Sequence, residues 1–332
     1  MSYSESDYAT ESDGIILLMG VTGAGKSYFL NQLKAGSVGE GHGLRSETKR
    51  CKGVKIELHE EDDDADGKPT SSIYVVDTPG FDDTDRGEGE IFEEISRYLA
   101  TQYKSGIPLK GILFFHRITD NRITGSSRKY MSIFRSLCGD HALKNVILVT
   151  TMWNKVPPAD QTRAFEREQE LIDDFWAPML RHRSFVAHFN GTSRSASSLV
   201  WQLARKEDVI LDIQRQIIDD DLEVYNTAAG QQLASILQAD RSRCAKRIAQ
   251  LKKEWEHCRD EERKEELRQD IEETQETIDK ITRSLRKMAV KIGDRIKEKI
   301  KDALSGPNIR TAIEVLTIVL NITLTIIKFV AS

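Results

Sequence analysis

The run GVTGAGKS at residues 20–27 holds the residues whose types and spacing most clearly indicate chemistry. It fits the pattern G-x-x-x-x-G-K-[ST], follows an apolar stretch at 15–19 and precedes a helical pattern. Glycines at this spacing let successive backbone N–H groups face phosphate oxygens, and the first turn of a helix adds partial positive charge. We expect Lys26 to contact the β- and γ-phosphates and the Ser27 hydroxyl to be a ligand of Mg²⁺. The predicted nucleotide-binding residues of this loop are Gly20, Thr22, Gly23, Ala24, Gly25, Lys26, Ser27 and Tyr28.

A second motif with the same chemistry is DTPG at residues 77–80, directly after an apolar run. An aspartate at the end of a strand can hold the hydration shell of Mg²⁺, and the N–H of Gly80 can approach a γ-phosphate because no Cβ intervenes. Between the two motifs, Thr48 is the residue that a switch loop would place on Mg²⁺, with Ser46 as the alternative. The expected metal-binding residues are Ser27, Thr48 and Asp77.

The elements that must position these motifs alternate along residues 14–205, where short β-rich runs are separated by helical patterns. This alternation is typical of an α/β domain with a mostly parallel sheet. Near-continuous apolar runs indicate strands covered by helices on both faces, whereas the second run alternates and predicts an edge strand. The six expected strands are 15–19, 54–58, 73–77, 112–116, 146–151 and 185–189.

Residues 206–304 have a different composition, without glycine or proline between Gly230 and Gly293. Apolar residues form two heptad seams, at 244–258 and 271–292, which are out of phase with each other. The phase break permits either one long coil with a stutter or a helical hairpin. A helix this long with a narrow apolar seam needs a partner, so the region is predicted to form a coiled coil.

The segment 311–330 is strongly apolar and is predicted to be a C-terminal helix. It carries one polar stripe when drawn as a helix, and a lipid-facing span rarely holds such residues. A helix packed on protein is therefore favoured over the two alternatives, a tail anchor in a membrane and an interfacial helix in contact with one. The stripe consists of Glu314, Thr317, Asn321, Thr325 and Lys328.

The bulk composition excludes several classes of function. A net charge of −5 over 332 residues argues against a nucleic-acid-binding surface spread over the protein. The four cysteines are widely spaced, which fits a reducing compartment and neither a disulfide framework nor a zinc site. Residues 1–13 are polar and acidic and lack the apolar core of a secretory signal, so a disordered lead and a cytoplasmic location are expected.

Taken together, the GVTGAGKS run, Thr48 with Lys49, and VVDTPGFDDT at 75–84 resemble the septin-related branch of translation-factor-type GTPases. That branch holds septins, immunity-associated GTPases and plastid import-receptor GTPases. The runs at 111–127, 134–139 and 146–156 are most similar to its fungal G-domain proteins. The resemblance covers about residues 14–205. It implies a Ras-like P-loop G domain, GTP or GDP with Mg²⁺ as ligands, and frequent nucleotide-dependent dimerisation.

The base-reading position departs from the pattern of that branch. Its N/T-K-x-D motif corresponds here to residues 151–154, so the amide of Asn154 stands where a carboxylate is expected. An amide loses or reverses one contact to guanine, which would weaken selectivity by roughly 1–3 kcal/mol. Trp153 either covers the base or packs in the core. The expected base-binding residues are Thr151, Trp153, Asn154 and, after the sixth strand, Asn190.

The hydrolytic position departs as well, because Phe81 follows Gly80 where many GTPases have a water-orienting glutamine. No catalytic residue is assigned; the candidates for an added group are His42, Arg45, Arg50 and Arg117. The predicted function is a GTP-binding switch or scaffold with slow or dimer-dependent hydrolysis, dimerising through the nucleotide face or the coiled coil. The alternatives are a nucleotide-loaded structural or tethering protein with negligible turnover and, because of Asn154, an ATP-dependent enzyme.

Overall fold

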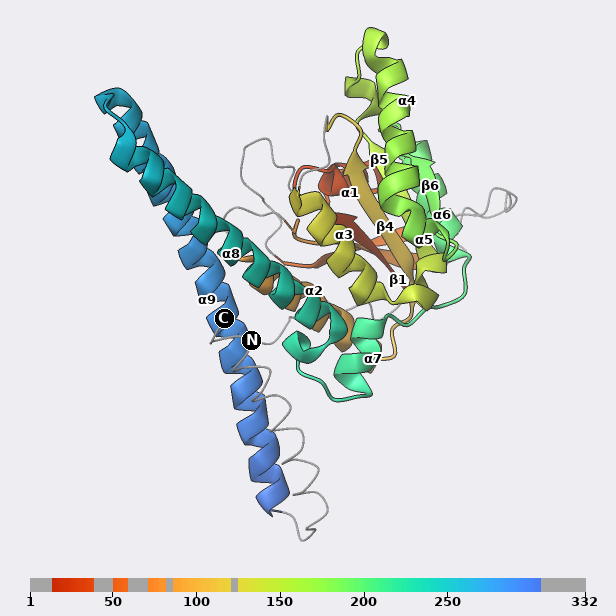
Figure 1. The fold of residues 1–332 in the computed structure, drawn as a ribbon. Coiled ribbons are helices and arrows are strands. Elements are labelled where there is room, and N and C mark those ends of the chain that lie inside the picture. The colour runs from red at the N-terminus through yellow and green to blue at the C-terminus, as the bar shows by residue number, and fades with distance from the viewer. Residues whose placement is uncertain (1–13, 39–49, 59–70, 82–85, 121–124, 306–332) are drawn as a thin grey trace. The chain divides into compact units, whose positions relative to one another are not determined.

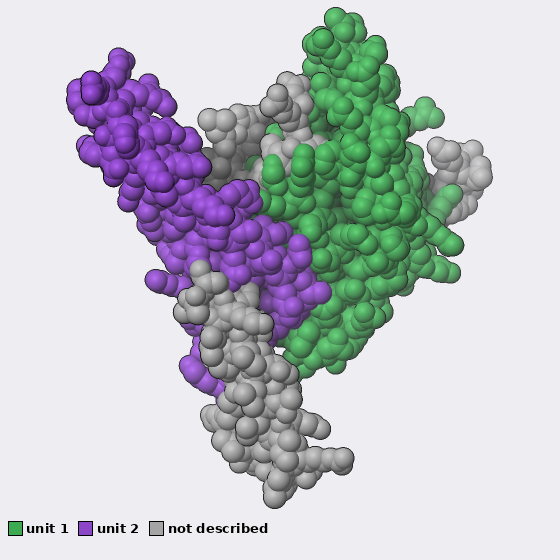
Figure 2. Space-filling view, viewed as in Figure 1, with its two compact units in different colours: residues 1–224 green, residues 225–332 purple. Residues whose placement is uncertain are grey.

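The computed structural model describes residues 14–38, 50–58, 71–81, 86–120 and 125–305. The chain divides into two compact units, residues 1–224 and 225–332, which Figure 2 colours green and purple. The first unit contains the sheet and its helices, and the second contains a pair of long helices. The predicted order of an α/β domain followed by a helical region is therefore confirmed.

The first unit is built on the six-stranded sheet that the apolar runs predict (Figure 1). The strand order is β2-β3-β1-β4-β5-β6; β2 is antiparallel to β3 and all other neighbours are parallel. The predicted edge position of β2 is confirmed, whereas every residue of β1 and β5 is buried, as in strands covered on both faces. The strands are β1 (Ile15–Gly20), β2 (Lys52–Leu58), β3 (Ser71–Asp77), β4 (Leu109–Arg117), β5 (Val146–Thr151) and β6 (Phe185–His188).

Helices pack on the sheet and on one another within this unit. Helices α1 and α6 contact each other and the central strands, and α7 packs against α2 and α3. A π-helical turn at Leu171–Trp176 joins α4 to α5. The helices are α1 (Lys26–Leu33), α2 (Glu88–Lys104), α3 (Gly125–Cys138), α4 (Gln161–Glu170), α5 (Ala177–Leu180), α6 (Ser193–Ala204) and α7 (Asp212–Ile218).

The parallel strands place both phosphate motifs at one edge of the sheet. Ligands of open α/β sheets bind at the carboxyl ends of the strands. Strands β1 and β3 are neighbours with Leu18 paired to Asp77, so the end of β3 lies beside the loop that follows β1. Strands β4, β5 and β6 end at Arg117, Thr151 and His188 along the same edge.

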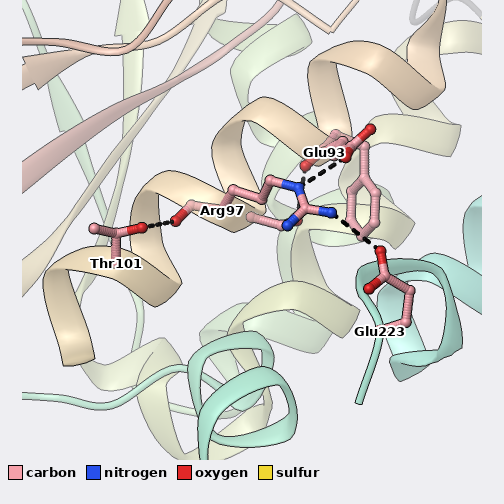
Figure 3. A network of polar contacts seen from close by, with 6 residues as sticks. Glu93, Arg97, Thr101 and Glu223 are labelled. Atoms are coloured by element: carbon pink, nitrogen blue, oxygen red, sulfur yellow. Dashed lines mark hydrogen bonds and ion pairs between the residues drawn. The ribbon is translucent and has the colours of Figure 1, made fainter. Parts of the chain in front are cut away.

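Helix α7 extends the first unit beyond residue 205, where the domain was expected to end. Gln214 of α7 is 1% exposed, and its Nε2 donates to a main-chain carbonyl of α2 at 3.1 Å. Figure 3 shows Arg97 of α2 between Glu93, at 2.7 Å, and Glu223, at 3.1 Å. Exposed ion pairs contribute little to stability, so the buried amide of Gln214 is the stronger tie between α2 and the end of the unit.

The second unit is a helical hairpin of α8 (Ala228–His257) and α9 (Glu261–Ser305), which lie side by side in Figure 1. The helix is interrupted at residues 258–260, where the two apolar seams change phase. The alternative of one long coil with a stutter is therefore wrong, and the alternative of a helical hairpin is right. Asp260 Oδ1 accepts a hydrogen bond from the Arg263 N–H at 3.1 Å and caps α9. Leu251 and Leu267, on either side of the break, are each 1% exposed. Assembly into a coiled coil stays a prediction.

The two ends of the chain carry predictions that fall outside the described residues. These are the disordered lead at 1–13 and the apolar helix at 311–330. Within the part of the chain that the structure describes, no helix is long and apolar enough to cross a bilayer.

Candidate functional site

The loop between β1 and α1 has the conformation that its glycines permit. Gly23 and Gly25 have φ values of 74° and 94°, and Gly25 caps the N-terminus of α1. Gly20 lies so close to β4 that a Cβ would stand 2.5 Å from the carbonyl oxygen of Phe115. Ala24 is fully buried at the base of the loop. A loop of this shape ahead of a helix N-terminus is suited to bind phosphate.

Lys26 opens α1 with its ammonium group folded back over the loop. Its Nζ donates to the carbonyl oxygens of Gly20, at 3.1 Å, and Val21, at 3.0 Å. The residue is 6% exposed, so a phosphate that contacts it would do so largely out of contact with water. Phosphate oxygens would be stronger acceptors than two neutral carbonyls. The geometry is that of a lysine ready to contact phosphate.

Two of the three expected metal-binding residues are brought together. The Ser27 hydroxyl donates to Asp77 Oδ2 at 2.8 Å, and Asp77 is fully buried. Thr48 lies outside the described residues. Hydroxyl and carboxylate oxygens are ligands that Mg²⁺ accepts, so the pair fits this ion. No group of three His, Cys, Asp or Glu side chains that could hold a metal lies among the described residues.

Gly80 and Phe81 continue from Asp77 along the same edge. A Cβ on Gly80 would collide with Thr22 Oγ1 and lie 2.5 Å from the Thr22 nitrogen, so the segment after β3 rests directly on the phosphate loop. Phe81 is 2% exposed and stacks on Tyr130, with ring centroids 5.4 Å apart. The side chain that follows Gly80 is therefore part of the core and does not face the water that would attack the nucleotide.

Arg117, at the end of β4, lies over the phosphate loop. Its Nη1 is 3.1 Å from the position that a Cβ on Gly23 would take, and its Nε is 3.0 Å from Asp120 Oδ1. His116 beside it is 5% exposed, and burial lowers its pKa, with Asp120 opposing that shift. Of the candidate groups for hydrolysis, Arg117 is thus placed at the loop. Arg50 is exposed ahead of β2, and His42 and Arg45 lie outside the described residues.

Residues expected to read the base converge from three elements. The Thr151 hydroxyl donates to the Ala24 carbonyl at 3.0 Å, which ties the end of β5 to the phosphate loop. Asn154 is exposed, and its Nδ2 is 3.9 Å from the position that a Cβ on Gly191 would take. The Tyr28 hydroxyl donates to the Gly191 carbonyl at 3.1 Å. Tyr28 of α1, Asn154 after β5 and Gly191 after β6 therefore lie close together.

Trp153 and Asn190 are engaged with the protein itself. The Trp153 ring stacks on His188, with centroids 4.4 Å apart and planes 22° apart, which favours packing over covering a base. Asn190 Oδ1 accepts from the backbone N–H of Thr192, at 3.1 Å, and from its hydroxyl, at 2.8 Å. Asn190 thus shapes the turn before α6, and its direct contact with a base stays a prediction.

The segment 151–155, which holds the base-reading motif, is called the base loop. Sequence reasoning missed two residues beside it, Thr150 and Glu168. The Thr150 hydroxyl donates to Glu168 Oε1 at 2.8 Å, and Glu168 is 7% exposed. Glu168 belongs to a charged helical run with exposed neighbours, and no signal in that run distinguishes the buried carboxylate from the others.

Solved structures that match this chain share little sequence with it. Toc33 from Arabidopsis thaliana, solved with GDP and Mg²⁺, is 17% identical; the comparison covers 60% of this chain and 88% of Toc33, with a TM-score of 0.47. Era from Aquifex aeolicus, solved with GDP and AlF4⁻, is 15% identical over 60% of this chain and 62% of that one, with a TM-score of 0.41.

Sequence comparison is more specific. GTP-binding protein A of Dictyostelium discoideum is 25% identical over 182 residues, or 52% of this chain. The matched part is 36% of that protein, so the chain spans about a third of the length of its curated relative. The family model described as AIG1 matches residues 15–186, just over half of the chain, and includes the phosphate loop, the motif at 77–80 and the base loop. The chain therefore belongs to the AIG1 family.

Proposed function

We propose that this chain is a GTP-binding switch or scaffold that takes Mg²⁺ with its nucleotide. The observation that carries the proposal is the convergence of Lys26, Ser27 and Asp77 on one phosphate loop. Membership of the AIG1 family and the 25% identical GTP-binding relative support it. Ser27 and Asp77 would hold the Mg²⁺ side of the nucleotide, and Lys26 the β- and γ-phosphates. Bound Mg²⁺ would neutralise charge on the phosphate oxygens.

We propose further that hydrolysis is slow in the isolated chain. Phe81 occupies the position after Gly80 and is buried against Tyr130, so it cannot orient an attacking water. The same observation favours a second candidate function, a nucleotide-loaded structural or tethering protein with negligible turnover. Turnover per chain that rises with protein concentration supports the switch, and no turnover at any concentration supports the structural protein.

The missing water-orienting group leads to a prediction about assembly. With a non-hydrolysable GTP analogue, the full-length chain is expected to double its mass in light scattering, because a second copy can bring a group to the nucleotide face. With GDP it is expected to stay monomeric. A dimer in both states would instead indicate assembly through the hairpin, and a monomer with analogue at tens of micromolar would contradict dimerisation through the nucleotide face.

The amide at position 154 leads to a prediction about base selection. Asn154→Asp is expected to raise the preference for GTP over ATP by about tenfold, because a carboxylate accepts both guanine donors where an amide accepts one. Competition binding measures the preference. Gln161→Glu, an amide-to-carboxylate change at an exposed residue at the start of α4, is the control and should leave the preference unchanged. Identical base preference in Asn154→Asp and wild type would remove Asn154 from the site.

We also propose that the chain is akin to the fungal G-domain proteins of the septin-related branch and acts in the cytoplasm. The runs at 111–127, 134–139 and 146–156 support the first proposal. The second is supported by the cysteines, all of which are free.

A further inference from the structure

A buried carboxylate that the proposed function does not use lies beside the base loop. Glu168 of α4 is 7% exposed, and both of its oxygens have partners. Oε1 accepts from the Thr150 hydroxyl at 2.8 Å, and Oε2 lies 2.8 Å from His188 Nε2. Thr150 and His188 are paired residues of the neighbouring strands β5 and β6. The carboxylate therefore joins α4 to two strand ends at the ligand-binding edge.

The Thr150 hydroxyl carries this contact on to the base loop. Trp153 Nε1 donates to Thr150 Oγ1 at 2.9 Å, and the Trp153 ring stacks on His188. Trp153 is the first residue of the 3-10 turn Trp153–Lys155, and Asn154 is the second. A chain of hydrogen bonds thus runs from Glu168 through Thr150 to the residue that precedes Asn154.

The direction of these hydrogen bonds follows from the carboxylate. An ionised Glu168 can only accept, so the single proton of the Thr150 hydroxyl is committed to it. The lone pairs of Thr150 are then left to accept from Trp153, whose indole N–H can only donate. A carboxylate at position 168 therefore fixes the direction of the Thr150 O–H bond, and with it the direction in which the Thr150 lone pairs accept from Trp153.

Stability alone does not explain a buried carboxylate. Burying an ion is costly, and well-packed apolar residues in place of a buried ion pair are often neutral or stabilising. The base loop, in contrast, requires contacts that hold its backbone conformation. It enters the turn through Met152 at φ 64°, a left-handed conformation that L-residues rarely adopt and that surrounding contacts must maintain.

We propose that Glu168, acting through Thr150 and Trp153, is a positioning residue that holds Asn154 for selection of the nucleotide base. The inference rests on the proposed function, since it assigns a role within the same site. Phosphate contacts should not depend on this network, because the neighbouring Thr151 is tied separately to the Ala24 carbonyl of the phosphate loop. Breaking the network should therefore lower base selectivity and leave phosphate affinity in place.

The test uses the full-length chain and three ligands with Mg²⁺: GDP, ADP and inorganic tripolyphosphate. Thr150→Val removes the hydroxyl with little change of shape, and Trp153→Phe removes the N–H but keeps an aromatic ring on His188. Each is expected to lower the GDP-to-ADP affinity ratio by about fivefold, the effect of one lost hydrogen bond. Tripolyphosphate affinity should not change. The double variant should lose no more than either single variant, because both break one chain of contacts.

Matched variants separate positioning from general damage. Glu168→Leu is expected to lower the ratio, whereas Glu166→Leu, the same change at an exposed position of α4, should not. Thr150→Ser keeps the hydroxyl and should restore the selectivity that Thr150→Val loses. Equal weakening of all three ligands, or an unchanged ratio in a folded Thr150→Val, would overturn the inference. Wild-type protein without a preference for GDP would overturn the proposed function itself, before any variant is made.

Discussion

Replacing Lys26 by alanine is expected to weaken binding of Mg²⁺–GTP by more than about 100-fold, which corresponds to the loss of a buried charged contact. The Lys26 ammonium lies over the loop carbonyls of Gly20 and Val21 and is 6% exposed, so bound phosphate would meet it in a site largely closed to water. Electrostatic contacts are strongest in such a site. Titration calorimetry of the full-length chain measures the change.

Lys34→Ala is the matched control for this variant. Lys34 follows the last residue of α1 and is exposed, so its removal takes one positive charge from the same helix without touching the loop. We expect wild-type affinity for this control, and circular dichroism should show that Lys26→Ala is folded. Equal affinities in Lys26→Ala and wild type would show that the loop is not the phosphate site.

The phosphate loop and the sheet could be predicted because their signals are local. Gly25, Lys26 and Ser27 are consecutive, and they follow an apolar run that is buried at every position of β1. The pairing of Ser27 with Asp77 could be anticipated from strand order, because the carboxyl ends of adjacent parallel strands meet at one edge. The edge position of β2 followed from its alternating pattern in the same way.

The base side of the site could be predicted only in outline. Thr151 and Asn154 belong to a recognisable motif, but the contacts that hold this loop come from Glu168 and His188, at distant positions in the chain. Burial of Glu168 depends on its contacts with Thr150 and His188 in the folded chain, and a charged residue in a charged helical run is normally exposed. Trp153 has two interpretations from sequence, and the stacking of its ring on His188, which favours packing, is a contact between distant positions in the chain.

The boundaries of the units depended on long-range contacts as well. Helix α7 is a short element, and nothing local indicates that Gln214 hydrogen-bonds to α2. The break at 258–260 could be expected from the phase of the apolar seams, but the seams permit a stutter and a hairpin equally. Packing of α8 on α9, with Leu251 and Leu267 buried next to the turn, is what selects the hairpin.

Ser27→Ala is expected to remove most of the Mg²⁺ dependence of nucleotide binding. In wild-type protein, chelation of Mg²⁺ by EDTA should weaken the affinity for a GTP analogue by about 100-fold, since a divalent cation supplies several kcal/mol at phosphate oxygens. The Ser27 hydroxyl is 2.8 Å from Asp77, so both oxygens lie where one ion can use them. Without the hydroxyl, affinity in Mg²⁺ should fall close to the EDTA value, as fluorescence titration with a labelled analogue would measure.

Two variants decide whether the Ser27–Asp77 contact belongs to a metal site or only connects β3 to α1. Ser27→Thr keeps a hydroxyl, because the loop pattern permits either serine or threonine at this position. This variant should retain the full loss of nucleotide affinity that EDTA causes in the wild-type protein. Asp77→Asn keeps a hydrogen-bond acceptor for Ser27 but loses the charge that attracts Mg²⁺, so its EDTA effect should shrink as in Ser27→Ala. If Asp77→Asn and Ser27→Ala both keep the wild-type response to EDTA, the hydrogen bond only joins β3 to α1, and Mg²⁺ binds elsewhere.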